Sequence, residues 1–114
     1  MKRILVVGST GQIGSELTMK LRGIYGDTNV VAGYIKGAEP KGELALSGPA
    51  EQADVTDALG IAEVVKKHKI DTIYNLAALL SAVAEQKPQL AWHIGVGGLF
   101  NILEVAREVG CAVF

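Results

Sequence analysis

The chain has 114 residues, of which 49% are apolar and 14 are glycine, and its net charge is −1. This length allows one small domain, and the glycine-rich, aromatic-poor composition is typical of an α/β protein. Balanced charge argues against a nucleic-acid partner, and no apolar run is long enough to be a signal peptide or to span a membrane. The single cysteine, Cys111, cannot form an internal disulfide, so we expect a cytoplasmic protein with a packed, reduced thiol.

The first half of the chain predicts two buried strands separated by a helix. Ile4–Val7 is apolar on both faces, as a central strand of a parallel sheet is. The next segment has Ile13, Leu17 and Leu21 on one helical face and meets a helix-ending glycine at Gly23. A second apolar run predicts another strand, and the stretch rich in glycine and proline after it predicts a mobile loop. The expected elements are a strand at 4–7, a helix at 12–22, a strand at 29–34 and a loop at 36–49.

The second half repeats the alternation of strand and helix. Thr56 is a candidate helix N-cap, and the helix it predicts ends in a cationic segment at residues 66–69 that suits the negative end of the helix dipole. Its apolar positions are Leu59, Ala62, Val64 and Val65. A long helix is bounded by Pro88 and Gly110. Adding strands at 51–54, 72–76 and 111–114, the chain predicts a doubly wound parallel α/β sheet that occupies residues 1–114 as one domain and ends inside its fifth strand.

A glycine-rich segment joins the first predicted strand to the first predicted helix. Gly8-Ser9-Thr10-Gly11-Gln12-Ile13-Gly14 has the spacing G-x-x-G-x-x-G. The first glycine would permit the turn, the second would let a pyrophosphate approach the backbone, and the third would let the helix pack closely. Unpaired N–H groups at the start of the helix would face the phosphates. We therefore expect a dinucleotide at Gly8, Gly11, Gln12, Ile13 and Gly14, the alternative being a glycine-rich turn without a ligand.

The residue that would select the cofactor is missing from its usual place. Folds that bind NAD usually carry Asp or Glu at the end of the second strand, where it binds the ribose hydroxyls. That place falls at Gly33-Tyr34, and the nearest acids, Asp27 and Glu39, lie before the strand or beyond it. Lys36 could meet a 2′-phosphate, although a solvated loop lysine is the simpler interpretation. We expect NAD as cofactor and leave NADP open.

Four segments together resemble the extended short-chain dehydrogenase/reductases, the epimerase/dehydratase superfamily. They are the glycine-rich segment, Asp54-Val55-Thr56-Asp57, Asn75-Leu76-Ala77-Ala78 and Leu99-Phe100-Asn101. Within that superfamily, residues 11–17 and 76–82 are most similar to the short-chain type of L-threonine 3-dehydrogenase. The resemblance implies a Rossmann fold, NAD as cofactor and oxidation of the 3-hydroxyl of L-threonine.

The same resemblance implies roles for particular residues. Asp54 and Val55 would border the adenine, with Asp54 accepting from its amino group. Leu76, Ala77 and Ala78 would line the central part of the cofactor, and Ser81 would reach the amino-acid substrate. The simpler alternatives are a helix-flanking turn residue for Asp54 and a capping hydroxyl for Ser81. No pattern of His, Cys or acidic residues predicts a metal site.

Two departures from the family pattern bear on activity. The catalytic serine and the Tyr-x-x-x-Lys pair that the family places after the fifth strand are absent, and Tyr25, Tyr34 and Tyr74 all lack a lysine four residues later. We expect the 114-residue chain to be inactive alone. The position of a supporting asparagine in the long helix falls at Gly95, inside a glycine cluster that predicts a bend or close packing. A sugar-nucleotide epimerase or dehydratase, or a non-catalytic dinucleotide-binding or assembly module, are the alternatives.

The long predicted helix carries apolar residues on more than one face. A helix of this kind must be buried on most sides, and in the family it pairs with its twin in a dimer. We therefore expect a homo-oligomer formed through residues 88–109. His93 has no partner of ligand type at helical spacing, so we interpret it as a surface or interface residue, and His68 as part of a charged helix end.

Overall fold

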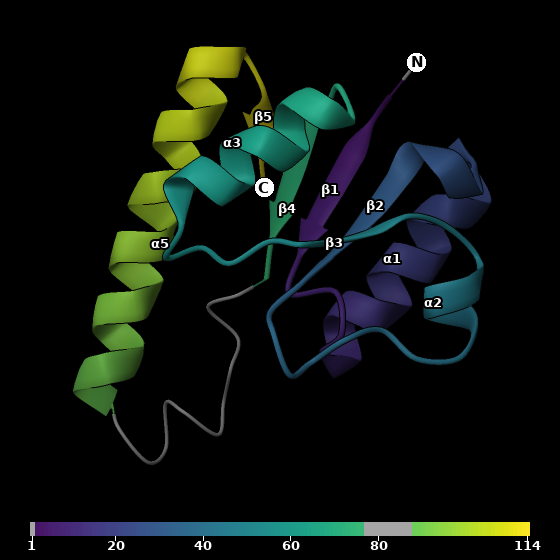
Figure 1. Ribbon diagram of the computed structural model, residues 1–114, viewed down its shortest axis with the longest axis horizontal. Helices are drawn as coiled ribbons and strands as arrows, with labels where there is room; N and C mark the ends of the chain where they lie inside the picture. Colours follow the sequence, from purple (N-terminus) through teal and green to yellow (C-terminus); the bar gives the residue numbers. More distant parts are fainter. Residues whose placement is uncertain (1, 77–87) are drawn as a thin grey trace.

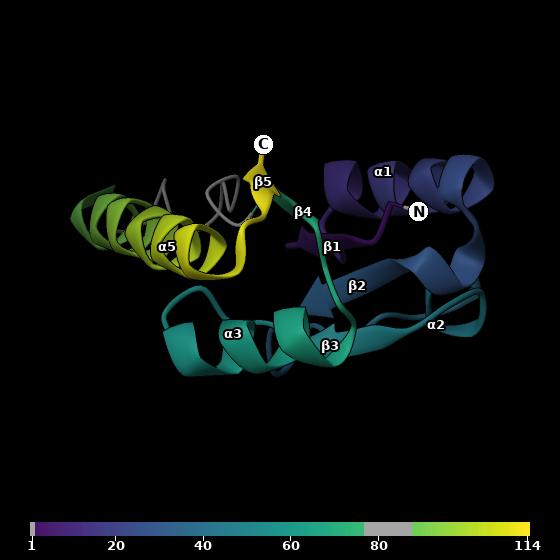
Figure 2. The same cartoon turned by 90° about the horizontal axis from the view of Figure 1, so that it is seen from above.

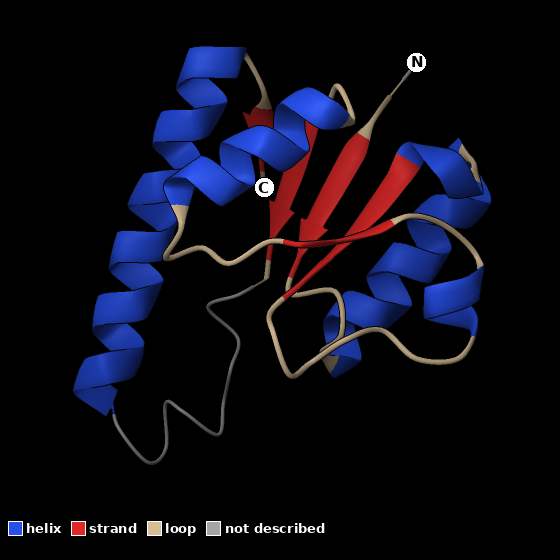
Figure 3. Cartoon of the chain, viewed as in Figure 1, coloured by secondary structure: helices blue, strands red, loops and turns tan. Residues whose placement is uncertain are grey.

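The computed structural model describes residues 2–76 and 88–114, and for residues 88–96 it describes the backbone alone. Within this part of the chain, five parallel strands form one sheet in the order β3-β2-β1-β4-β5 (Figures 1 and 3). The predicted doubly wound parallel sheet is confirmed. The strands are β1 (Ile4–Val7), β2 (Val30–Tyr34), β3 (Ala50–Gln52), β4 (Thr72–Asn75) and β5 (Ala112–Val113).

Strand β1 is the centre of the sheet because both of its faces are apolar. Leu5 and Val7 belong to one core, and Ile4 and Val6 belong to another on the opposite face. All four side chains are at most 1% exposed. Since successive side chains of a strand point to opposite faces, a strand with no polar position must be covered on both sides.

Helices cover the two faces of the sheet (Figure 2). Helix α1 (Gln12–Tyr25) covers one face, where Leu17 and Leu21 pack on β1 and β2. Helices α3 (Ala58–Lys67) and α5 (Pro88–Val109) lie on the other face and pack on each other. In the described part of the chain, no helix is both long enough and apolar enough to cross a bilayer.

Two predictions about the first half of the chain were wrong in detail. Gly23 does not end α1: it is exposed inside the helix, which continues to Tyr25 and is stopped by Gly26 with φ 99°. A glycine on an exposed helix face costs only about 0.5–1 kcal/mol, which tertiary packing can offset. The expected loop at 36–49 contains a short helix, α2 (Glu43–Leu46), and a 3-10 turn at Asp27–Asn29 precedes β2.

The second half also departs from the predicted boundaries. Strand β3 lies earlier than expected, and the cap of α3 is Asp57, whose side chain accepts from the Gly60 N–H at 3.1 Å, and not Thr56. Leu59 is 78% exposed because it points away from the sheet, and Ile13, expected on the core face of α1, is 60% exposed. Both stand in the first turn of a helix, which projects beyond the sheet, so helical spacing alone does not bury them.

Candidate functional site at the carboxyl edge of the sheet

The carboxyl ends of the parallel strands bring the sequence-predicted site residues to one edge. The turn after β1 is bonded to the end of β2 through the Ser9 N–H, which donates to the Gly33 carbonyl at 3.0 Å. On the other side, the Leu76 N–H donates to the Val7 carbonyl at 2.9 Å, so the end of β4 adjoins the same turn. Open α/β sheets bind ligands at this edge, where helices leave in opposite directions from neighbouring strands.

The fold itself requires two of the three glycines of the turn. Gly8 has φ 82°, a conformation that side chains with a Cβ rarely adopt. A Cβ on Gly14 would overlap the carbonyl oxygen of Gly8, so Gly14 permits the close contact between α1 and the turn. These two glycines are explained by the fold itself, and their predicted structural roles are confirmed.

Gly11 has no such structural reason to be glycine. Its backbone is extended (φ −70°, ψ 169°), and among the described residues a Cβ there would meet only the Gly8 carbonyl oxygen, at an ordinary 3.7 Å. It is the N-cap of α1, and no side chain caps the helix. The N–H groups of the first turn therefore face an open surface where a phosphate group fits. A side chain at Gly11 would occupy that space, so the residues present fit a pyrophosphate.

Ser9 holds the turn in place, a role that the sequence did not reveal. Its side chain is fully buried, and its hydroxyl donates to the Gly33 carbonyl at 2.8 Å. Together with the Ser9 N–H it gives that carbonyl two donors from one residue. A small polar residue directly after the first glycine was the available signal.

Asp54 and Val55 follow β3, and the structure gives them different surroundings. One carboxylate oxygen of Asp54, Oδ1, accepts from the Thr56 N–H at 2.9 Å and from the Thr56 hydroxyl at 2.7 Å. Val55 is buried, and its carbonyl accepts from Asn101 Nδ2 at 2.8 Å. Asp54 also lines a cavity of about 380 Å³ between β3 and α3, which the glycine-rich turn does not border. Asp54 therefore stabilises the turn before α3, and its second carboxylate oxygen makes no hydrogen bond within the described part of the chain.

Close packing against Val55 explains one member of the glycine cluster in α5. A Cβ on Gly98 would lie 2.5 Å from a methyl carbon of Val55, whereas around Gly97 the described residues leave open space within 4 Å. Gly98 therefore lets α5 approach the end of β3, which agrees with the close packing predicted for the glycine cluster. Gly95, the third member, lies in the stretch for which only the backbone is described.

A second cavity, of about 360 Å³, borders the glycine-rich turn directly. Thr10 and Ser15 line it from the turn and the start of α1, and Glu39 and Lys41 line it from the segment after β2. The Gly37 N–H donates to the Glu39 carboxylate at 3.0 Å, and this bond lowers the pKa of Glu39. Glu39, placed beyond the strand by sequence alone, is thereby brought beside the turn.

The family model for the NAD-dependent epimerase/dehydratase family matches residues 4–114. The chain belongs to this family. An uncharacterised epimerase/dehydratase of Staphylococcus saprophyticus is 49% identical to it over 108 residues, which are 95% of this chain and 33% of that protein. The predicted family resemblance is confirmed.

Solved structures give the same result in three dimensions. L-threonine dehydrogenase from Clostridium difficile is 50% identical with a TM-score of 0.86, over all of this chain and 35% of that one. The holo form of a GalE-like L-threonine dehydrogenase from Cupriavidus necator is 42% identical with a TM-score of 0.85, over 98% of this chain and 35% of that one. A UDP-glucose 4-epimerase is 26% identical with a TM-score of 0.77, over 94% of this chain and 32% of that one. The chain spans about a third of the length of these proteins.

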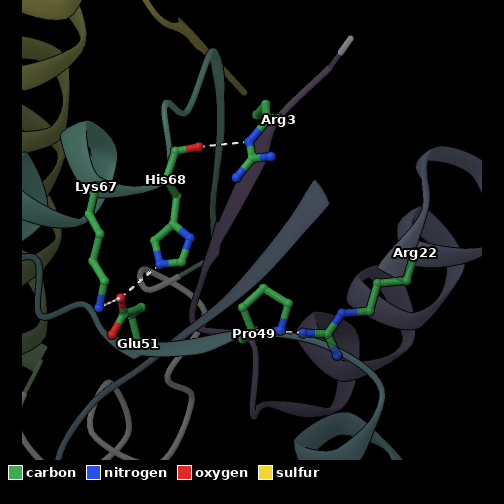
Figure 4. A network of polar contacts seen from close by, with 6 residues as sticks. All are labelled: Arg3, Arg22, Pro49, Glu51, Lys67 and His68. Atoms are coloured by element: carbon green, nitrogen blue, oxygen red, sulfur yellow. Dashed lines mark hydrogen bonds and ion pairs between the residues drawn. The ribbon is translucent and has the colours of Figure 1, made fainter. Parts of the chain in front are cut away.

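In this epimerase/dehydratase-family chain, β3 is held by side chains from both sides (Figure 4). Arg22 of α1 is 2% exposed, and its guanidinium donates to three carbonyl oxygens and one hydroxyl. The sequence placed it at the end of a surface helix and missed this role, because its partners lie 8 to 27 residues away. These partners are Val30 O at 3.2 Å, Leu44 O at 2.8 Å, Ser47 Oγ at 2.9 Å and Pro49 O at 2.8 Å.

An ion-pair cluster at the end of α3 holds β3 from the other side. The Glu51 carboxylate lies 2.9 Å from Lys67 Nζ and 2.7 Å from His68 Nε2. The hydrogen bond from Lys67, followed by that from His68, lowers the pKa of Glu51. Arg3 Nε donates to the His68 carbonyl at 2.7 Å, which ties the cluster to β1 (Figure 4). His68 thus has a structural role at the charged helix end where the sequence placed it.

Some of the remaining sequence-predicted residues fall outside the described part of the chain. Ala77, Ala78 and Ser81 lie outside the described residues, and the same holds for the side chain of His93. Cys111 is half-buried, its thiol contacts the Ile70 carbonyl at 3.0 Å, and burial raises its pKa, as expected of an unreactive packed thiol. Among the described residues, no group of three or more His, Cys, Asp or Glu side chains could hold a metal ion.

Proposed function

We propose that this chain binds NAD along the carboxyl edge of its sheet and forms the dinucleotide-binding portion of an oxidoreductase similar to L-threonine 3-dehydrogenase. The observation that carries the proposal is Gly11, a glycine that the described structure needs neither for its backbone conformation nor for its packing. Gly11 stands at a helix N-terminus that no side chain caps. The family to which the chain belongs is the NAD-dependent epimerase/dehydratase family. A bound pyrophosphate gives this glycine a reason.

Different residues along the carboxyl edge of the sheet would contact different parts of the cofactor. The first N–H groups of α1, at Gln12 and Ile13, would donate to the pyrophosphate. Asp54 and Val55 would border the adenine. Leu76, with Ala77 and Ala78, would line the middle of the cofactor, and Ser81 would bind the amino-acid substrate. When bound, the nicotinamide would accept a hydride from the carbon that bears the 3-hydroxyl of L-threonine.

Titration calorimetry with NAD tests the binding proposal. Gly11→Val should weaken NAD at least about tenfold because its side chain fills the space of a phosphate group, while the free energy of unfolding stays within about 0.5 kcal/mol. Gly23→Val is the matched control, because Gly23 is exposed on α1 with no described atom near its Cβ position. Equal affinities in Gly11→Val and the wild type would remove the turn from the site.

The activity of the whole protein is proposed from the likeness to the two L-threonine dehydrogenases, which are 50% and 42% identical to this chain. A sugar-nucleotide epimerase is the second candidate, supported by the 26% identity to a UDP-glucose 4-epimerase. Threonine-dependent NADH formation and epimerisation of UDP-glucose, measured on the complete protein, separate the two. The 114-residue chain carries no Tyr-x-x-x-Lys sequence, so we predict that alone it forms no NADH from threonine.

We also propose that the chain self-associates through α5. Ile102 and Val105 of this helix are buried, but Leu99, Phe100 and Leu103 on the adjoining side of it are 43%, 63% and 49% exposed. A contiguous exposed apolar face of this kind favours association. Light scattering over a concentration series should show oligomers that Leu103→Glu dissociates, whereas Leu59→Glu, at an exposed leucine of α3, leaves them intact. A strictly monomeric wild type at high micromolar concentration would reject the proposal.

A further inference from the structure

We infer that Glu39 binds the hydroxyls of the adenosine ribose and makes this chain select NAD over NADP. This inference rests on the proposed function, since it assigns a residue within the same dinucleotide site. Glu39 would take the place of the acidic residue that dinucleotide-binding sheets usually carry at the end of the second strand. The argument rests on the end of β2, the turn that follows it and the cavity beside the glycine-rich turn.

The end of β2 cannot itself supply the acid. A Cβ on Gly33 would lie 2.8 Å from the Val6 carbonyl oxygen and 3.0 Å from Cβ of Ala53, so this position has no room for a side chain. The next residue, Tyr34, is half-buried and carries a phenol in place of a carboxylate. A group that accepts from ribose hydroxyls must therefore come from further along the chain.

A tight turn directly after β2 brings such a group back. The Ala38 N–H donates to the Ile35 carbonyl at 3.0 Å, and Gly37 has φ 92°, the conformation that the third position of a type II turn requires. The Gly37 N–H then donates to Glu39 at 3.0 Å. The turn and this bond together hold the Glu39 carboxylate at the cavity that Thr10 and Ser15 line from the other side.

The cavity places Glu39 within reach of a ribose. Thr10 and Ser15, which line it from the glycine-rich turn and α1, flank Gly11, where the pyrophosphate would lie. The adenosine ribose is bonded to that pyrophosphate, so it must lie next to this position. A carboxylate there accepts from the 2′- and 3′-hydroxyls and repels a 2′-phosphate. The pKa of Glu39 is held low by the Gly37 N–H, so the group is ionised at neutral pH.

The neighbouring lysines do not reverse this selection. Lys41 lines the same cavity, and its charge helps to lower the pKa of Glu39, so it favours the ionised carboxylate. Lys36, the residue that the sequence proposed for a 2′-phosphate, is exposed and does not line the cavity. A 2′-phosphate in this cavity would therefore meet the ionised carboxylate of Glu39 beside Lys41.

Titration calorimetry with ADP-ribose and with 2′-phospho-ADP-ribose tests the inference, because neither ligand carries the nicotinamide and neither depends on turnover. The wild type should bind ADP-ribose at least about tenfold more tightly. Glu39→Gln should weaken ADP-ribose about tenfold and leave the phosphorylated ligand unchanged or tighter, so that the preference falls close to one. Glu43→Gln, which removes the same charge from α2 outside the cavity, should keep the wild-type preference.

The outcomes separate this inference from the proposed function. If the wild type binds neither ligand, the proposed function fails and the inference fails with it. If the wild type binds ADP-ribose and Glu39→Gln changes neither affinity, the site stands and Glu39 is rejected. A wild type that prefers 2′-phospho-ADP-ribose also overturns the inference. Thermal unfolding of the exposed Glu39→Gln variant should match the wild type, which excludes misfolding as the cause of lost binding.

Discussion

The two sides of the candidate site are built in opposite ways. On the side of β1, the turn at residues 8–14 is shaped by its own glycines and by the helix that follows it directly. On the side of β3, residues 49–55 have three strand residues and depend on α1, α3 and α5 for their position. A structural feature formed by neighbouring residues can be recognised in a short sequence motif. A feature held by contacts between distant segments cannot be recognised in this way.

The strongest test of the local side is Gly14→Ala. A Cβ at this position would overlap the Gly8 carbonyl, and neither backbone segment can move without opening the turn. We expect a loss of about 3 kcal/mol or more in the free energy of unfolding, together with loss of NAD binding. Urea unfolding and calorimetry measure both. Gly11→Ala is the matched control and should lose NAD affinity with little change in stability; equal destabilisation by the two variants would contradict the division of roles within the turn.

The assembled side should depend most on Arg22. Arg22→Met keeps the apolar stem but removes the donor to the Leu44 carbonyl and leaves the Pro49 carbonyl with the Ala32 N–H alone. We expect a loss of about 2–3 kcal/mol and faster proteolysis between residues 43 and 52 than in the wild type. Arg107→Met, at an arginine that is exposed on α5 and paired with Glu104, should leave the free energy of unfolding close to that of the wild type. Similar effects of the two variants would show that burial of Arg22 is unimportant.

Gly98→Ala tests the contact between α5 and the end of β3. The added methyl group must displace Val55, at a cost of about 1–2 kcal/mol, and should weaken NAD through the adenine side. Gly97→Ala is the neighbouring control: its Cβ position is open among the described residues, so the better helix propensity should stabilise the protein by about 0.5–1 kcal/mol. Two substitutions of the same kind, one residue apart, should therefore have opposite signs in thermal unfolding.

The smallest expected effect is that of the Glu51 cluster. Because Lys67 and His68 lower the pKa of Glu51, its carboxylate contributes stability above the ordinary glutamate pKa of roughly 4.3, and that contribution is lost as the pH falls through the lowered pKa. Glu51→Gln should cost less than about 1 kcal/mol at pH 7, since Lys67 is largely exposed. The difference between the variant and the wild type in urea unfolding should shrink as the pH falls through the lowered pKa of Glu51. A difference that stays constant as the pH falls would assign it to packing.

The match between prediction and structure follows the same division. The glycines of the turn at residues 8–14 and the central strand were predictable because their spacing and apolar pattern lie within a few residues, whereas the bonds from Ser9 to the Gly33 carbonyl were not. Element boundaries failed where a distant contact decided them: α1 passes Gly23, and β3 starts at Ala50, next to the carbonyl of Pro49 to which Arg22 donates. The family resemblance supplied Asp54 and Val55, which no local pattern singles out.

The sequence by itself determined the order of strands and helices, the parallel sheet and the glycine-rich turn, because hydrophobic period and backbone freedom act over short distances. Only the tertiary structure decided why Gly98 must lack a side chain, why Arg22 is buried, and why Glu39 lies beside a turn more than twenty residues away. The physical reason is that close packing and buried hydrogen bonds depend on which segments meet in space. That information enters a sequence only through residues that, taken one at a time, resemble ordinary surface positions.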